Sequence, residues 1–316
     1  MILVTGGSGF VGLNIVEQLL ARGEKVLVFD VSRPKLDVAF EKGDTTDVPR
    51  LDEAFGKHKP RIVIHLAAIT ADAKRDAKEP QRIVDVNLIG TLNVLEAAKE
   101  HGAKRFVHAS TGAVFGAAGM GAPAPLGEED RVAPGSMYAI SKYAAERAVL
   151  RMAELWSMDV RVGRFATVYG KWEHATGARD VLSPPTELAK IALAGGEAVF
   201  PPLGDNDYIY APDQAGALIA LMDAPSPKHR LYHLGAGEAW SLPEWCSLLS
   251  KKFPSFRWRE SSDWDACNVR PLAPGTRTRF DTRRLVDDLG WKARFDLASS
   301  CDDFVSWLQS TGATPR

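Results

Sequence analysis

The chain has 316 residues, of which 45% are hydrophobic and 25% are charged, so it is long and apolar enough to bury a sizeable core. Disordered proteins and disulfide-stapled miniproteins are therefore excluded, and the length favours one large domain or two modest ones. Lys and Arg total 39 against 40 Asp and Glu, a net charge of -1, so no global positive field exists to attract nucleic acid or anionic lipid.

The cysteines and the N-terminus bear on the cellular compartment. Cys246, Cys267 and Cys301 are widely spaced, odd in number and without a CxxC or Cys/His pattern, which predicts free thiols and no metal site. The chain starts directly with an apolar strand, without a basic segment or cleavage site, and has no apolar run of about 18 residues. We expect a cytoplasmic protein with neither a nucleic-acid nor a membrane partner.

The first half alternates short apolar runs with amphipathic helical patterns. Strands are predicted at Ile2–Thr5, Lys25–Phe29, Val38–Glu41, Arg61–Leu66, Arg105–Ala109 and Val160–Phe165. Helices are predicted at Phe10–Ala21, Arg82–Glu100 and Met137–Trp156. Continuous apolar strands that alternate with helices indicate an α/β fold with a doubly wound parallel (Rossmann) sheet. Residues 1–165 are expected to form a domain of this kind.

The composition changes in the second half, residues 166–316. All eight tryptophans lie between Trp156 and Trp307, and Pro/Gly-rich stretches separate short helical patterns. These helices are predicted at Pro185–Leu193, Ala215–Met222, Leu242–Lys251, Arg283–Leu289 and Cys301–Leu308. We expect a smaller α+β substrate-binding region whose strands and helices can interleave with the first domain.

A glycine-rich turn joins the first strand to the first helix. The run from Thr5 to Gly12 (TGGSGFVG) is compatible with both a GxGxxG and a GxxGxxG reading. In either reading, glycines allow a tight turn and close backbone approach to a pyrophosphate, which the helix N-terminus stabilises. The candidate dinucleotide-binding residues of this turn are Gly6, Gly9, Phe10, Val11 and Gly12.

Acidic residues after the next two strands suggest which dinucleotide binds. Asp30 lies 18 positions beyond Gly12, where a carboxylate accepts hydrogen bonds from both adenosine ribose hydroxyls and repels a 2′-phosphate. NAD is therefore the expected cofactor, although Arg33 could turn toward a 2′-phosphate. Asp44, followed by Thr45, either lies near the adenine or belongs to an ordinary turn.

Tyr138 and Lys142 lie four residues apart at the start of a strongly helical segment. This spacing places both side chains on one helix face, where an ammonium stabilises a phenolate and lowers a reference pKa of about 10. Such a pair suits general acid/base catalysis. Tyr/Lys pairs at this spacing are also frequent on ordinary helices, so the pair alone does not establish a catalytic site.

Several motifs occur in the order and spacing of one known family. They are the glycine turn, Asp30, HLAA at 65–68, DVN at 85–87, Ser110-Thr111, Tyr138/Lys142, RFATVYG at 164–170, DYIYAPD at 207–213 and LGWKARF at 289–295. Over nearly its whole length the chain resembles the extended short-chain dehydrogenases/reductases. More narrowly, it resembles the NAD-dependent epimerase/dehydratase family typified by UDP-galactose 4-epimerase.

The resemblance implies roles for individual residues. Thr111, with Ser110 as a second candidate, would hydrogen-bond the reacting oxygen, Tyr138 would exchange the hydroxyl proton, and Lys142 would tune Tyr138 and hold the nicotinamide ribose. Asn87 and the backbone of Leu66, Ala67 and Ala68 would line the cofactor groove, whereas His65 is expected to be structural. The implied reaction is hydride transfer between a sugar-like carbon and NAD.

The chain departs from the family pattern at positions that bear on the substrate. Gly112 and Ala113 replace the Asp-Glu pair of the dehydratases, which disfavours 4,6-dehydration. Asn206 replaces an arginine that grips a diphosphate and Thr167 replaces an asparagine, whereas Arg270 matches a later phosphate-gripping position without the usual Gly-Asp. Losing one charge-assisted contact costs about 1.5–3 kcal/mol, so a diphosphate substrate is less secure.

Four further residues are candidates for substrate contacts: Thr70, Arg179, Tyr210 and Arg277. We expect an NAD-dependent oxidoreductase that acts on a secondary alcohol of a sugar, sugar acid or similar polyol. A nucleotide-sugar 4-epimerase that retains its NAD and a non-catalytic NAD-binding regulatory protein are the alternatives. The resemblance also implies a homodimer, with Ala97, Ala98, Ala144, Ala145 and Ala148 on the outer faces of two long helices.

Overall fold

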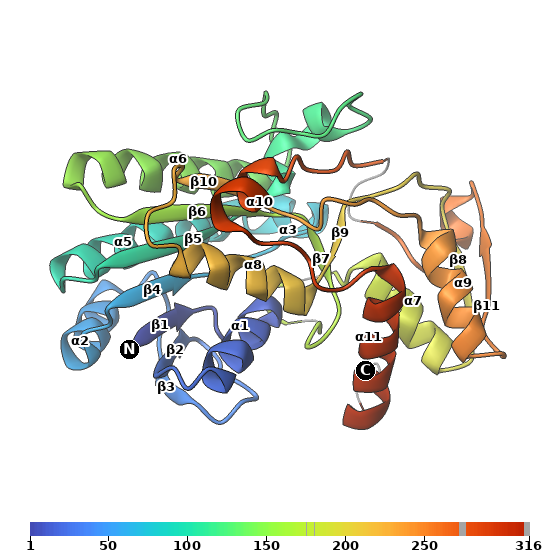
Figure 1. The fold of residues 1–316 in the computed structure, drawn as a ribbon, viewed down its shortest axis with the longest axis horizontal. Helices are drawn as coiled ribbons and strands as arrows, with labels where there is room; N and C mark the ends of the chain where they lie inside the picture. Colours follow the sequence, from blue (N-terminus) through green and yellow to red (C-terminus); the bar gives the residue numbers. More distant parts are fainter. Residues whose placement is uncertain (175, 180, 272–275, 313–316) are drawn as a thin grey trace.

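The computed structural model describes residues 1–174, 176–179, 181–271 and 276–312. Its central feature is a parallel sheet in the strand order β10-β6-β5-β4-β1-β2-β3 (Figure 1). The strands are β1 (Ile2–Thr5), β2 (Val26–Asp30), β3 (Ala39–Lys42), β4 (Ile62–His65), β5 (Arg105–Thr111), β6 (Val160–Phe165) and β10 (Leu231–Leu234). The strand order reverses between the neighbours β1 and β4, because the chain returns from β3 across β2 and β1 before it forms β4. This reversal confirms the predicted doubly wound fold.

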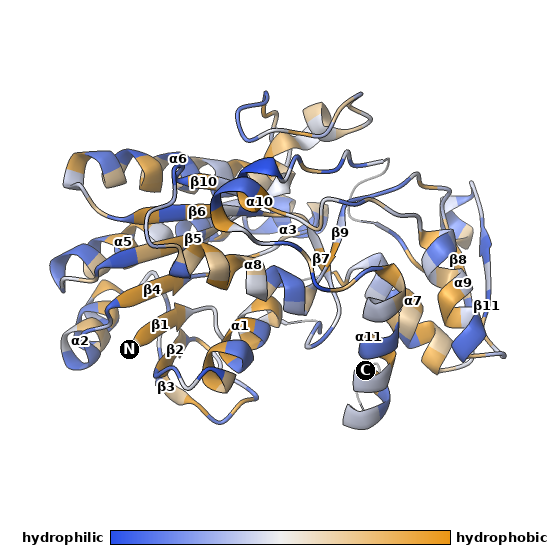
Figure 2. Ribbon diagram, in the orientation of Figure 1, coloured by the Kyte–Doolittle hydropathy of each residue, from blue (hydrophilic) through white to orange (hydrophobic). Residues whose placement is uncertain are grey.

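Helices cover both faces of this sheet because alternate strand residues point to opposite sides. Ile2 and Val4 pack with α1 (Phe10–Ala21) and α8 (Ala211–Asp223), whereas Leu3 packs with the helices on the other face. The helices of that second face are α2 (Val48–His58), α5 (Gly90–Glu100) and α6 (Met137–Trp156). Figure 2 shows the resulting band of hydrophobic strands between the two helical layers.

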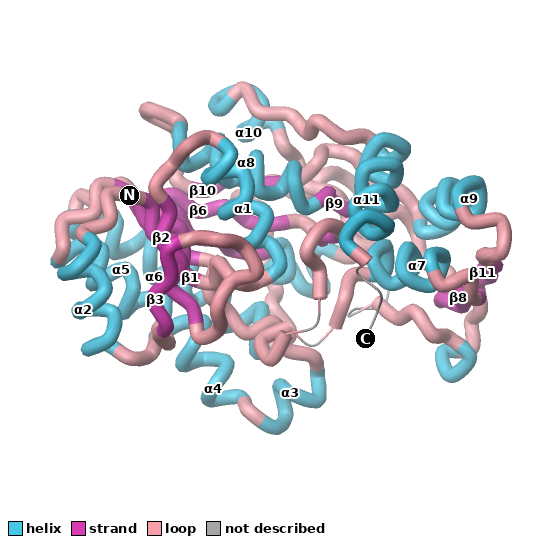
Figure 3. The backbone as a smooth tube through the Cα atoms, turned by 90° about the horizontal axis from the view of Figure 1, so that it is seen from below, coloured by secondary structure: helices cyan, strands magenta, loops and turns pink. Residues whose placement is uncertain are grey.

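A second lobe is built from residues beyond β6. It contains two short parallel pairs, β7 (Thr167–Tyr169) with β9 (Tyr208–Tyr210) and β8 (Glu197–Phe200) with β11 (Arg257–Glu260). Its helices are α7 (Pro184–Leu193), α9 (Leu242–Lys252) and α11 (Leu297–Thr311), and they pack around a core that contains Trp240 and Trp245. Figure 3 shows this lobe beside the carboxyl ends of the sheet strands.

The remaining elements are short. They are α3 (Ala73–Lys78), α4 (Pro80–Val84), the π-helix η1 (Asp85–Ile89), the 3₁₀-helices η2 (Gly112–Gly119) and η3 (Trp264–Ala266), and α10 (Arg283–Leu289). Segments α4, η1 and α5 follow one another without a break where one helix, Arg82–Glu100, was predicted. Two elements from the second half of the chain belong to the first lobe: β10 joins the sheet, and α8 joins the helical layer that covers it.

Several predicted elements have the same bounds in the structure: β1, α1, α6, β6 and α10. Helix α2 was not predicted, since its buried face contains only Leu51, Ala54 and Phe55. Helix α11 begins at Leu297 rather than at Cys301 because Asp296 and Ser299 form a capping box. The sequence also did not locate the strands β8, β9, β10 and β11.

The prediction of small residues on the outer helix faces was wrong for three of the five alanines. Ala97, Ala98 and Ala145 are buried against the sheet, because they lie on the same stripes as Val94 and Val149. Ala144 and Ala148 are half-buried. The three cysteines are buried and unpaired. No helix within the described parts of the chain is both long and apolar enough to cross a membrane.

Candidate active site

A cavity of about 1530 Å³ lies between the carboxyl ends of the sheet strands and the second lobe. Ligands of open α/β sheets bind at this edge, next to the point where the strand order reverses. The predicted cofactor residues that line it are Gly6, Gly9, Phe10, Val11, Gly12, Asp30, Asp44, Thr45, Leu66, Ala67, Ala68, Tyr138 and Lys142. Of the other predicted site residues, Ser110, Thr111, Thr70, Thr167, Arg179, Asn206, Arg270 and Arg277 also line it.

The glycine turn has no room for side chains at two of its positions. Gly6 has a φ of +69°, and a Cβ there would lie 2.6 Å from the backbone nitrogen of Ala67. A Cβ at Gly12 would lie 2.2 Å from the carbonyl oxygen of Gly6. No side chain caps α1 at Gly9, so its first N–H groups remain open toward the cavity. This bare, positively polarised cradle fits the pyrophosphate of a dinucleotide.

Asp30 ends β2 on the rim of the cavity. Its carboxylate accepts hydrogen bonds from the backbone N–H groups of Ser8 (3.0 Å) and Ser32 (3.2 Å), and desolvation raises its pKa. These bonds hold the carboxylate in place and leave it able to accept from ribose hydroxyls. The guanidinium of Arg33 lies over the ring of Phe40, 5.2 Å from its centroid.

Asp44 also lines the cavity and is paired with Arg82. Desolvation raises its pKa, but hydrogen bonds from Thr46 and from Arg82 outweigh desolvation and leave the pKa below its usual value. The residue is therefore a charged carboxylate at the same end of the cavity as Asp30.

The loop after β4 is held by a chain of buried hydrogen bonds. His65 Nε2 lies 2.9 Å from the hydroxyl of Thr91, which donates its own proton to the carbonyl of Asn87, so Nε2 is the donor. His65 Nδ1 then accepts from Thr5 at 2.7 Å. Desolvation lowers the pKa of His65 to about 3, so the ring is neutral. His65 is a structural residue that fixes the start of the Leu66–Ala68 loop.

Asn87 does not line the cavity, contrary to its prediction as a cofactor residue. Its Oδ1 accepts from the N–H of Ile69 at 2.7 Å, and its Nδ2 donates to the carbonyl of Ile69 and to the hydroxyl of Ser141. Ser141 in turn donates to the carbonyl of Tyr138. The amide is thus fully used in joining the loop to the helix that carries Tyr138, and Asn87 acts as a positioning residue within the π-helix η1.

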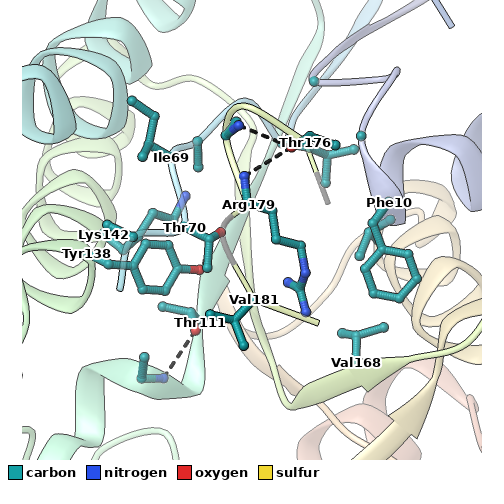
Figure 4. A pocket seen from close by; sticks show the side chains of 18 of the residues that line it. Phe10, Ile69, Thr70, Thr111, Tyr138, Lys142, Val168, Thr176, Arg179 and Val181 are labelled. Atoms are coloured by element: carbon teal, nitrogen blue, oxygen red, sulfur yellow. Dashed lines mark hydrogen bonds between the residues drawn. The ribbon is translucent and has the colours of Figure 1, made fainter. Parts of the chain in front are cut away.

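The helix α6 carries Tyr138 and Lys142 on the wall of the cavity. Ser136 caps α6 by accepting from the N–H of Ala139, which places Tyr138 in the first turn. Figure 4 shows the Tyr138 and Lys142 side chains next to Thr111 and Thr70. Desolvation lowers the pKa of Lys142 to about 7, and the buried carboxylate of Glu146 opposes this shift.

Ser110 and Thr111 end β5 beside this pair, but only one keeps its hydroxyl proton available. Ser110 donates to Glu146 Oε2 at 2.7 Å, so its proton is committed. Thr111 accepts from the N–H of Ala113 at 3.1 Å and donates to no other residue in the described parts of the chain. Thr111 is therefore the better placed of the two to donate to a reacting oxygen.

Behind these residues lies a fully buried ion pair. Glu146 accepts from Arg164 at 2.6 Å and 2.9 Å as well as from Ser110, and the two charged side chains are 0% and 3% exposed. Arg164 also donates to the carbonyl of Glu128. The ion pair joins α6, β5 and β6, the three elements that carry or flank the catalytic side chains. Because the resemblance assigns it no role, the sequence interpretation did not include it.

Arg179 reaches into the cavity from a segment that lies against the β4 loop. Thr70 donates its N–H to the carbonyl of Ala178 at 2.7 Å, and the Arg179 guanidinium lies 5.3 Å from the centroid of the Phe10 ring (Figure 4). The same guanidinium pairs with the buried carboxylate of Glu173 at 2.6 Å.

Tyr210 does not line the cavity, so its prediction as a substrate contact was wrong. It is 3% exposed in the core of the second lobe, and its hydroxyl donates to Asp303 at 2.8 Å. Its neighbour on β9, Tyr208, lines the cavity instead. The sequence run DYIYAPD does not distinguish the two tyrosines, because residues two apart on a strand lie on the same face. Only Tyr208, which follows shortly after the cavity-lining Asn206, reaches the cavity.

Comparisons with known proteins show the family to which the chain belongs. The model of the NAD-dependent epimerase/dehydratase family matches residues 2–235. A putative UDP-glucose 4-epimerase of Methanocaldococcus jannaschii is 27% identical, covering 99% of this chain and 100% of its own. A dTDP-glucose 4,6-dehydratase of Streptomyces niveus is 29% identical over 99% of this chain and 94% of its own.

Solved structures of UDP-glucose 4-epimerases are also similar to this chain over nearly its whole length. The UDP-glucose 4-epimerase of Thermotoga maritima, solved with UDP-glucose, has a TM-score of 0.82 and 26% identity, with 98% of this chain and 99% of that chain covered. The Thermus thermophilus UDP-glucose 4-epimerase, solved with NAD, has a TM-score of 0.78 and 26% identity, with 98% of each chain covered. The predicted resemblance and cofactor are confirmed, and the chain belongs to the NAD-dependent epimerase/dehydratase family as an NAD-dependent oxidoreductase of sugar-like substrates.

Proposed function

We propose that the protein oxidises one secondary alcohol of a sugar or sugar acid, or reduces the corresponding ketone, with Tyr138 as the catalytic acid/base. The observation that supports this most directly is that Tyr138, Lys142 and Thr111 line the same cavity as the glycine turn. A reacting carbon held beside these three side chains lies next to the cradle that suits the dinucleotide.

When bound, NAD exchanges a hydride with the substrate carbon. During oxidation, Tyr138 removes the proton of the reacting hydroxyl, and during reduction it returns that proton. Lys142, when protonated, stabilises the phenolate, and Glu146 favours that protonated form because its carboxylate raises the pKa of the buried ammonium. Thr111 donates a hydrogen bond that holds the substrate oxygen in line with the phenol.

The arrangement does not support a 4,6-dehydratase. Gly112 and Ala113 follow Thr111 at the start of η2, so no carboxyl group is available there to protonate a leaving hydroxyl. A side chain at Gly112 would also meet the ring of Phe280, because a Cβ would lie 2.6 Å from it.

The second candidate is a nucleotide-sugar 4-epimerase, which the full-length likeness to UDP-glucose 4-epimerases favours. Two features of the diphosphate region weigh against it. Asn206 is neutral and its amide is engaged with Gly204 and Arg277, while Arg270 Nε donates to the carbonyl of Cys267. Asn206 thus offers a diphosphate neither charge nor a free amide, whereas Arg270 keeps its terminal N–H groups and is the one charged residue of this pair on the cavity wall.

The test is a panel of aldoses, uronic acids, aldonic acids and nucleotide sugars with NAD, followed by absorbance at 340 nm and product analysis. We expect NADH to accumulate with the true substrate, whereas an epimerase would give a new isomer without net absorbance change. Tyr138→Phe should abolish turnover without impairing NAD binding. Tyr143→Phe is the matched control, because Tyr143 lies on the same helix and does not line the cavity. Full activity in Tyr138→Phe would contradict the proposal.

We also propose that the protein is a homodimer in the cytoplasm. Large apolar side chains are exposed on α6, with Ile140 at 44% and Leu155 at 57%, and Ala144 and Ala148 are half-buried on the same helix. Such a face permits close packing against a second copy. The cytoplasmic location is supported by the three cysteines, which are buried free thiols, as expected in a reducing compartment. Light scattering would test the assembly: we expect a dimeric mass that Ala144→Arg lowers to that of the monomer.

A further inference from the structure

Arg277 is held in the cavity by its backbone. It forms an antiparallel bridge with Met120, and the next residue, Thr278, donates to the carbonyl of Gly119 at 2.9 Å. From the opposite side, Asn206 Oδ1 accepts from the N–H of Arg277 at 2.8 Å. The position from which the guanidinium extends is therefore fixed by two separate elements, the η2 end and the start of β9.

The guanidinium of Arg277 differs from those of the two other arginines that the sequence suggested for the substrate. Arg179 is paired with Glu173 at 2.6 Å, and Arg270 lies 3.9 Å from the exposed carboxylate of Asp265. Arg277 lines the cavity and makes neither an ion pair nor a side-chain hydrogen bond with any residue in the described ranges. Within the described ranges it is a cation on the cavity wall that no carboxylate pairs with directly.

The surroundings of Arg277 indicate where a ligand would lie. Desolvation lowers the pKa of Arg277, and the charges of Asp207, Tyr138 and Tyr208 oppose the shift. Asp207 forms no ion pair with Arg277 among the described residues: its Oδ2 accepts from the N–H of Phe280 at 2.9 Å, and its Oδ1 has no hydrogen-bond partner there. Tyr138, which we propose exchanges the proton, lines the same cavity as Arg277 and as Met120, the residue to which Arg277 is bridged. We expect an anion bound to Arg277 to share this cavity with the reacting carbon.

We propose that Arg277 binds a carboxylate that the substrate carries within a few bonds of the reacting carbon, so that the substrate is a sugar acid. This inference rests on the proposed function and narrows it. A single guanidinium matches a single carboxylate through two parallel hydrogen bonds. A diphosphate carries more charge, and Asn206, which faces this region, supplies none.

Asn206 has a positioning role in the same proposal. Its amide connects the carbonyl of Gly204 to the backbone N–H of Arg277, so it fixes the backbone from which the guanidinium extends. Asn206→Ala should raise KM for the sugar acid while kcat stays close to that of the wild type. A loss of kcat with an unchanged KM would contradict this role.

The experiment compares each sugar acid with the neutral analogue that has a hydroxymethyl group in place of the carboxylate. With NAD present, we expect kcat/KM to favour the best acid by about 10- to 100-fold, the range expected for a charged hydrogen-bonded pair. Arg277→Gln should remove this preference. Arg277→Lys, which keeps the positive charge but loses the two parallel N–H donors of the guanidinium, should retain part of it. Arg279→Gln is the control, because Arg279 is exposed and does not line the cavity.

A binding measurement separates failure of this inference from failure of the proposed function. The unfolding temperature of the NAD-loaded protein should rise with the sugar acid, and this rise should be lost in Arg277→Gln and kept in Arg279→Gln. Absence of NADH and of new isomers with every compound would contradict the proposed function. Turnover that is equal for acid and neutral analogues, or equally reduced for both by Arg277→Gln, would contradict only the carboxylate site.

Discussion

Replacing Glu146 by glutamine tests whether the buried ion pair behind the active site supports the fold. The carboxylate is 0% exposed and accepts from Arg164 at 2.6 Å and 2.9 Å and from Ser110 at 2.7 Å. Glutamine keeps the size of the side chain but removes its charge. Its NH₂ group would also face the hydrogen-bond donors of Arg164 and Ser110, which need an acceptor. Leaving the Arg164 guanidinium buried without a counterion should cost about 3–5 kcal/mol, a large part of the 5–15 kcal/mol that is typical of total stability.

Urea unfolding followed by tryptophan fluorescence measures this change, since the chain has eight tryptophans. Glu154→Gln is the matched control, because Glu154 lies on the same helix in an ion pair with Arg151 but is 63% exposed, so little change is expected. A loss of less than about 1 kcal/mol in Glu146→Gln would show that the pair is not a dominant contribution and would refute the reasoning.

The same variant should also change catalysis. Glu146 raises the pKa of Lys142, which desolvation has lowered to about 7, so removing the carboxylate lowers this pKa further. Lys142 then loses its proton at a lower pH, and the pH range in which it can stabilise a phenolate contracts toward acid. The alkaline limb of the kcat/KM profile should move to lower pH in Glu146→Gln. It should stay in place in Glu154→Gln, and an unmoved limb in both would argue against the electrostatic link.

Three further changes address the cofactor and the catalytic lysine. Gly12→Ala should abolish NAD binding, measured by NADH fluorescence, because its Cβ would lie 2.2 Å from a backbone oxygen that cannot move away; wild-type affinity would contradict this. Asp30→Ala should reduce the preference for NAD over NADP by at least about tenfold in kcat/KM, and equal use of both by the wild type would oppose the assignment of Asp30. Lys142→Met should unfold at higher urea concentration than the wild type at pH 6–7. The folded-state pKa of Lys142, about 7, lies below the unfolded value of 10.5, so burying the charge destabilises the wild type at low pH and the cost fades as pH rises toward 10.5. The two proteins should therefore converge near pH 10, and a constant difference from pH 6 to 10 would contradict this explanation.

The sequence predicted the elements whose signals are local. The glycine turn lies between a strand and a helix, and the spacing of Tyr138 and Lys142 is a property of one helix, so both can be identified without knowing their neighbours. The same holds for the sheet strands β1, β2, β4, β5 and β6, because burial on both faces requires a continuous apolar run, whereas β10 of the same sheet was not located. Helix α2 was missed since only three of its residues are buried, which leaves a weak periodic pattern.

Side-chain direction depended on contacts that no local pattern contains. Asn87 turns toward Ile69 and Ser141 rather than the cavity, and Tyr210 turns into the core of the second lobe. Ala97 and Ala145 are buried within the chain itself rather than exposed on an outer helix face. In each case the face that a residue presents is set by an element far away in the chain, so the residue type alone is compatible with either direction.

Taken by itself, the sequence predicted the doubly wound fold, the NAD cradle and the helix that carries the Tyr138/Lys142 pair, because the signal of each element comes from residues close together in the chain. By resemblance it matched Arg270 to a phosphate-gripping position, and it left Arg179 and Arg277 as undistinguished further candidates. Only the tertiary structure decided that Arg179 has a carboxylate partner in Glu173 and that Arg277 faces the cavity without one. The charge balance of a buried group is the sum over all neighbours in space, and the groups around Arg277, such as Asp207 and Tyr138, come from segments far from it in sequence.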